Sequence, residues 1–255
     1  MITLTEAQLY AWVSPVFWPF LRTLAVFTSA PIFSSRAIPI RAKVALAFFV
    51  ALASQVSLPA MPIVGFNEVA ALGAVAQQVV IGLAIGFSVR VVFAAVELAG
   101  EVVGFQMGLN FAAFFDPSMN AQTSALGRFL GQMAGLLFVV LNGHIMVLMA
   151  VTRSFDAFPV GGNVFENLDQ LKLFQLGTDL FASGLWIALP MVGMLMFVNL
   201  ALGIVSRVAP QMNIFAVGFP VTLAVGLLGV ALTLPLLETP YIALMERAIS
   251  LFMGS

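Results

Sequence analysis

The sequence predicts an all-α membrane protein, and its scarcity of charge is the first reason. Of 255 residues, 62% are hydrophobic and only 8% are charged, and the mean hydropathy is +1.09. A soluble domain carries about 25% charged residues, so this chain has too few to cover a soluble globule of its length. The apolar residues also gather in about six segments, most of them near the ~20 residues that a membrane helix needs. Because each segment must satisfy its own backbone in lipid, helices are expected.

The first two segments lie before residue 60. The first runs from about Leu9 to Ile32 and is interrupted by prolines and by Arg22. An arginine at the centre of a span costs ~2.5–3.5 kcal/mol on insertion scales, so Arg22 must face protein, water or headgroups. It is either a pore-facing charge or a side chain that polar partners or snorkelling satisfy. The second segment, from about Val44 to Leu58, is short for a span.

The third segment, about Val69 to Phe93, leads into a polar tail with Glu97 and Glu101. These carboxylates lie one helical turn apart on one face. They could bind cations or protons, pair with an arginine, or mark where the helix leaves the apolar layer. The fourth segment, about Leu126 to Val151, contains His144. A buried histidine can relay protons, but more often it donates a hydrogen bond to a neighbouring helix.

The last two apolar segments run from about Leu180 to Val205 and from about Ile214 to Leu237. A tail from Glu238 to Ser255 follows, with large apolar residues at helical spacing. That spacing predicts a short amphipathic helix, which would lie on the bilayer surface or on neighbouring protein.

Two sets of glycines, spaced four residues apart, flank the stretch between the third and fourth segments. On a helix this spacing places the glycines on one face and lets another backbone approach closely. Ordinary packing between spans would produce the same spacing. The glycines assigned to close packing are Gly100, Gly104, Gly108, Gly127, Gly131 and Gly135.

The stretch between these glycines is too apolar for a solvated loop and too broken for a clean span. A cluster of Phe and Met can close a pore because a narrow apolar constriction loses its water, and Met lets the seal reshape. A hydrophobic loop packed on its own protein would have the same composition, so both interpretations stand at this point. The residues assigned to a plug or gate are Gln106, Met107, Leu109, Phe111, Phe114, Phe115, Asp116, Pro117 and Met119.

The sequence offers little for catalysis. It has no cysteine and a single histidine, and it contains no common hydrolase, metalloprotease or phosphate-binding motif. We therefore expect no enzymatic activity, cofactor or metal. The net charge of −1 gives no reason to expect nucleic acid as a partner.

Several runs of residues resemble the FliR family, the export-gate membrane proteins of flagellar type III secretion, whose injectisome counterparts are called SctT. The runs near the N-terminus are FWPFLR and SAPIFSSRAIPIRAK. The later runs are AAVELAGEVVGFQMGLNFAAFFDP, LNGH, SFDAFP and NLALGIVSRVAPQMNIFAVGFP. They occur in the family's order and cover nearly the whole chain.

The resemblance implies a subunit of kinked helical hairpins in a hetero-oligomeric helical export gate. Its implied partners are FliP-like, FliQ-like and FlhB-like subunits, membrane lipid, and unfolded proteins in transit. The implied location is the bacterial inner membrane, in the flagellar basal body. Residues 1–175 would be a FliP-like part with a plug loop at about 106–122, residues 176–237 a FliQ-like hairpin, and residues 238–255 the amphipathic tail.

An ion-coupled secondary transporter is the alternative. Such a protein would show paired charges near span centres and inverted repeats with broken helices. The prolines of the first segment and the spaced glycines favour this class, whereas the lack of an evident repeat counts against it.

Overall fold

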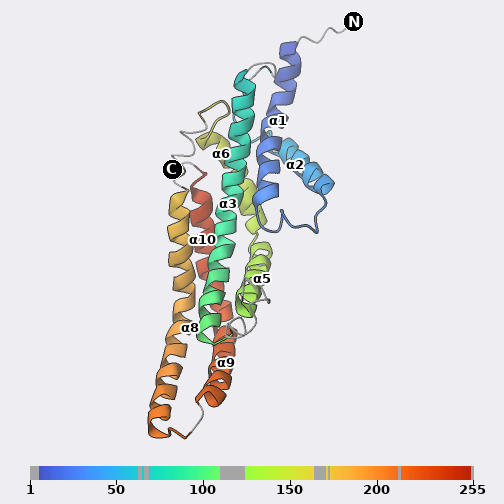
Figure 1. Ribbon diagram of the computed structural model, residues 1–255. Coiled ribbons are helices and arrows are strands. Elements are labelled where there is room, and N and C mark those ends of the chain that lie inside the picture. The colour runs from blue at the N-terminus through green and yellow to red at the C-terminus, as the bar shows by residue number, and fades with distance from the viewer. Residues whose placement is uncertain are drawn as a thin grey trace. The chain divides into compact units, whose positions relative to one another are not determined.

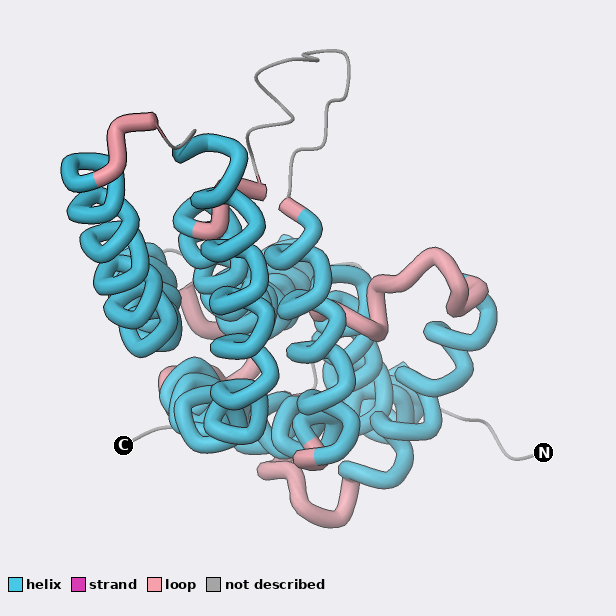
Figure 2. Tube along the Cα trace, turned by 90° about the horizontal axis from the view of Figure 1, so that it is seen from below, coloured by secondary structure: helices cyan, strands magenta, loops and turns pink. Residues whose placement is uncertain are grey.

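A computed structural model describes residues 6–62, 65, 69–109, 124–163, 171, 173–211 and 214–253. The regular structure in these ranges is helical (Figure 1), and Figure 2 shows no strand among them. The helices are α1 (Glu6–Ser29), α2 (Ile40–Ser54), α3 (Val69–Gln106), α5 (Ala125–Val140), α6 (Gly143–Ala157), α8 (Phe174–Val208), α9 (Ile214–Thr233), the 3-10 helix η1 (Leu234–Leu237) and α10 (Glu238–Ser250).

The all-α membrane class is confirmed. Within the described ranges, three helical stretches are long and apolar enough to cross a membrane: Ala70–Gln106, Phe174–Val208 and Ala216–Ser250. The bent pair α5 and α6 would make a fourth if it formed one span. The helix α2 is too short, because its 15 residues extend about 22 Å against a hydrocarbon core of about 30 Å.

The fourth predicted segment is broken, which corrects the expectation of one continuous helix. The helices α5 and α6 meet at an angle of 68°, and Asn142 between them has a left-handed backbone with φ of 56°. Asparagine and glycine tolerate this conformation at a helix end. The LNGH run therefore marks a kink.

The third segment is longer than predicted, since α3 continues 13 residues past Phe93 to Gln106. Neither Glu97 nor Glu101 interrupts the helix. The prolines in the first segment do not stop α1 either, which contains Pro15 and Pro19. The segments thus predict the existence of the helices better than their ends.

The described chain forms two compact units, each assembled from separate stretches of sequence. The first comprises residues 1–91, 138–177 and 245–255, and the second comprises residues 92–137 and 178–244. This division follows spatial contacts, and one of its boundaries falls between Gly177 and Thr178. The division into FliP-like and FliQ-like parts stays a prediction.

Arg22 lies in the core of the first unit and is 0% exposed. Its Nε donates to Gln78 Oε1 at 2.8 Å, one terminal nitrogen donates to Ser154 Oγ at 2.8 Å, and the other donates to the Phe158 carbonyl at 2.9 Å. The guanidinium carbon also lies 3.5 Å from the centroid of the Phe155 ring. One side chain of α1 thereby contacts both α3 and α6, and in this structure polar partners satisfy it.

The network around Arg22 extends along α3. Gln78 donates to the side chain of Gln77 at 3.2 Å, and Gln77 donates to the Pro159 carbonyl at 2.9 Å. The Gly161 N–H donates back to Gln77 Oε1 at 2.9 Å. Because carbonyls at a helix C-terminus attract cations, the end of α6 is a favourable place for the charge of Arg22.

Close contact between α1 and α3 depends on Gly82. A Cβ at this position would lie 2.6 Å from the Cβ of Ala25 and would also meet the Arg22 carbonyl. The backbones of α1 and α3 can approach this closely only because Gly82 has no side chain. This approach lets Arg22 reach Gln78.

We expect Arg22→Met to destabilise the protein by roughly 2–4 kcal/mol, because it leaves buried acceptors without a donor. The measurement is thermal unfolding of the detergent-solubilised protein. Arg153→Met, which changes an exposed arginine of α6, is the matched control and should change the midpoint little. Equal midpoints for the two variants would contradict a structural role for Arg22.

Candidate functional site

The candidate site lies in the second unit, where the end of α3 meets the start of α5. Residues 110–123 connect these helices and lie outside the described residues. Six of the predicted plug residues belong to them: Phe111, Phe114, Phe115, Asp116, Pro117 and Met119. The described part of the site is the pair of stems on either side, which end at Leu109 and begin at Ser124.

Contact between the two helices is closest at Gly100. A Cβ on Gly100 would lie 2.7 Å from Gly127 Cα and 2.8 Å from the Leu126 carbonyl oxygen. Farther along α5, a Cβ on Gly131 would lie 3.9 Å from Glu97, and one on Gly135 would lie 4.0 Å from Phe93. Gly100, Gly127, Gly131 and Gly135 therefore lie at one helix contact, and its tightest point is the crossing of Gly100 with Gly127.

The first stem ends α3 with a hydrogen-bonded turn. The Gly108 N–H donates to the Phe105 carbonyl at 3.0 Å, and the Leu109 N–H donates to the Gly104 carbonyl at 3.0 Å. Gly108 has φ of 79°, as the Schellman motif requires of the residue after a helix. Gly108 lies beyond the last helical residue, so the expectation that it continues the glycine face of α3 is corrected.

The second stem begins at Ser124, whose side chain caps α5. Its Oγ accepts the Gly127 N–H at 2.9 Å, which is the usual N-cap bond to the third residue of a helix. The Ser124 N–H donates to the Glu101 carboxylate on α3. A Cβ on Gly104 would lie 3.0 Å from Ser124 Oγ. The Glu101 carboxylate therefore bonds the start of α5 to α3, and Gly104 leaves room for the Ser124 side chain.

The plug residues that the structure describes are buried to different degrees. Met107 is fully buried, whereas Gln106 and Leu109 are half-buried. Met107 packs against Gly226 of α9, a contact that sequence reasoning missed. A glycine in the middle of an apolar helix carries no signal of the residue that will fill its notch.

His144 lies in the first turn of α6, directly after the kink, and is half-buried. Its neighbour Gly143 is closely packed, since a Cβ there would lie 2.6 Å from Phe138 Cδ2. Sequence reasoning also missed Tyr241 of the tail, which is 1% exposed and packs edge-on to Phe93 with ring centroids 6.3 Å apart.

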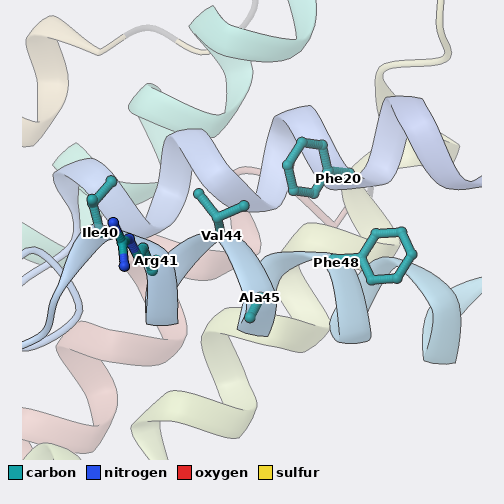
Figure 3. Close-up of a pocket in the computed structure, with 6 residues that line it drawn as sticks. All are labelled: Phe20, Ile40, Arg41, Val44, Ala45 and Phe48. Atoms are coloured by element: carbon teal, nitrogen blue, oxygen red, sulfur yellow. The ribbon is translucent and has the colours of Figure 1, made fainter.

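An apolar groove of about 420 Å³ lies between α1 and α2 in the first unit. Figure 3 shows Phe20 of α1 across from side chains of α2, with Arg41 toward one end and Phe48 toward the other. Such a lining suits apolar chains or helices rather than polar metabolites. Among the described residues, no group of three or more His, Cys, Asp or Glu is placed to hold a metal ion.

Together, the apolar helices and the close α3–α5 junction define an all-α membrane protein with a glycine-packed helix pair. The family model for bacterial export proteins, family 1, matches residues 13–248, and the chain belongs to this family. It is 41% identical over 237 residues to the flagellar biosynthetic protein FliR of Escherichia coli (strain K12), covering 93% of this chain and 90% of that protein.

Relatives from other bacteria are also similar to this chain. Flagellar biosynthetic protein FliR of Bacillus subtilis (strain 168) is 32% identical over 210 residues, covering 81% of this chain and 80% of that protein. The counterpart from Aquifex aeolicus (strain VF5) is 30% identical over 219 residues. The predicted membership of the FliR family is confirmed, and nothing in these relatives supports the ion-coupled transporter.

We expect Gly100→Ala to destabilise the α3–α5 junction by about 1–3 kcal/mol, because the added methyl group meets backbone that cannot yield easily. Gly135→Ala is the matched control. Its Cβ has room, and alanine favours a helix by about 0.5–1 kcal/mol. The two variants are compared by their thermal unfolding midpoints and by the yield of intact complex. Equal yields would argue against close packing at Gly100.

Proposed function

We propose that this chain is a core subunit of the flagellar type III export gate, and that it contributes part of the pore and its apolar plug. The observation that carries this proposal is the anchoring of both stems around residues 110–123. The α3 stem ends in a Schellman turn, and the α5 stem is capped by Ser124 and bonded to Glu101. A seal needs fixed ends if its apolar middle is to occupy one position.

The proposed action is physical rather than enzymatic. The Phe and Met side chains of the segment would close a narrow passage by excluding water. Unfolded export substrates would displace them, and the unbranched, deformable Met side chains would follow the passing chain. No residue is assigned a catalytic role, and no cofactor is required.

Exposed apolar side chains support assembly with partners. On α2 Phe49 is 65% exposed, and on α8 Trp186 and Phe197 are 71% and 76% exposed. Apolar surface on this scale marks contact with lipid or with other proteins. We propose that FliP-like, FliQ-like and FlhB-like subunits and lipid cover it, in the bacterial inner membrane at the flagellar basal body.

The contacts of α8 and α9 support a FliQ-like hairpin at residues 176–237. A Cβ on Gly229 would lie 3.9 Å from Met191 Cγ, and one on Gly218 would lie 3.6 Å from Leu202 Cδ1. These two helices pack on each other at both points. The FliP-like assignment of residues 1–175 rests on the family resemblance.

The test is ion conductance of the purified complex in lipid bilayers. Replacing Phe111, Phe114 and Phe115 together by alanine should increase conductance, because the thinned seal admits water. Phe174→Ala, which removes an exposed ring from α8, is the control and should leave conductance unchanged. Unchanged conductance of the triple variant, in a complex of normal composition, would refute the plug assignment.

A further inference from the structure

Met107 lies one residue beyond α3, yet its side chain is 0% exposed. It fills a notch in α9 at Gly226. A Cβ on Gly226 would lie 2.5 Å from Met107 Cγ, 2.6 Å from Sδ and 2.7 Å from Cε. The Met107 side chain therefore occupies the space that a side chain at position 226 would need.

The Met107 backbone also lies against α9. The Thr222 hydroxyl lies 3.4 Å from the Met107 carbonyl oxygen and 3.1 Å from the Gly218 carbonyl oxygen. Thr222 lies one helical turn before Gly226, so both residues share the face of α9 that meets Met107. Side chain and backbone of Met107 thus contact the same short stretch of α9.

We propose that Gly226 and Thr222 are positioning residues that form a size-selective seat for Met107, and that this seat sets where the α3 stem enters the plug. The proposal rests on the proposed function of residues 110–123. Its new content is that the position of the seal depends on α9, a helix far from it in the sequence.

The backbone after Met107 is fixed, so a movement of Met107 would also move the residues that follow it. The next residue, Gly108, has the left-handed φ of 79°, and the Leu109 N–H is bonded back to Gly104. The chain therefore leaves α3 in a fixed direction immediately after Met107. An added methyl group at Gly226 would overlap Met107 along its length, from Cγ to Cε. Because interiors are close-packed, Met107 has to move, and the proposal is that part of this movement reaches the stem.

The chain supplies a matched control at Gly229, three residues farther along α9. A Cβ there would meet Met194 on α8 instead of Met107. Gly226→Ala and Gly229→Ala are thus the same chemical change in the same helix, and both oppose a methionine. Only the methyl group of Gly226→Ala would contact Met107, at the end of the α3 stem.

The experiment measures ion conductance of the purified complex in bilayers for Gly226→Ala, Gly229→Ala, Met107→Ala and the double variant Met107→Ala/Gly226→Ala. Gly226→Ala should raise conductance about fivefold, because about 1 kcal/mol of overpacking changes the ratio of sealed to unsealed complexes by about that factor. Gly229→Ala should leave it unchanged. Met107→Ala should leak because the seat is empty, and the double variant should leak less because the new methyl group refills the notch.

The alanine variant of Phe111, Phe114 and Phe115 is measured alongside. If it leaks while Gly226→Ala does not, the seat is refuted and the plug stands; if neither leaks, the proposed function itself fails. If Gly226→Ala does not enter the complex, the comparison of Met107→Ala with the double variant Met107→Ala/Gly226→Ala tests the seat. A double variant that leaks less than Met107→Ala supports the seat, and one that leaks as much or more overturns it.

Discussion

The guanidinium of Arg22 is the interaction on which the first unit depends. It joins α1 to α3 through Gln78 and to α6 through Ser154 and the Phe158 carbonyl. A buried charge is tolerated only when its donors are satisfied, so these helices must keep their relative positions. Gly82 permits the close approach that this bonding requires. The same fixed arrangement holds the residues 159–161 that follow α6, through Gln77.

The second unit relies on missing side chains rather than on a charge. Gly100 lets α5 cross α3 at backbone distance, and Gly226 receives Met107. Polar groups then act locally at the helix ends, where Glu101 and Ser124 satisfy backbone N–H groups that a helix start leaves free. The proposed gate therefore has stiff stems made from small residues and caps, with large apolar residues kept for the segment between them.

The helices themselves were largely predictable, because a run of about 20 apolar residues has few alternatives in lipid. The kink at Asn142 and the extension of α3 to Gln106 were missed. Hydropathy reports burial and says little about where a helix ends, whereas the end is set by backbone conformation at Asn142 and Gly108. Asparagine followed by glycine was a visible signal of the kink at Asn142. Glycine spacing alone gave no sign that α3 ends before Gly108.

By itself the sequence determined the membrane class, the family and the location of the Phe and Met stretch between two glycine sets. Only the tertiary structure decided what those residues contact. Gly100 opposes Gly127, Met107 enters α9 at Gly226, and Arg22 bonds to residues 56 and more positions away. Composition and spacing are properties of one segment, while a notch and its occupant belong to two segments that meet only in the folded chain.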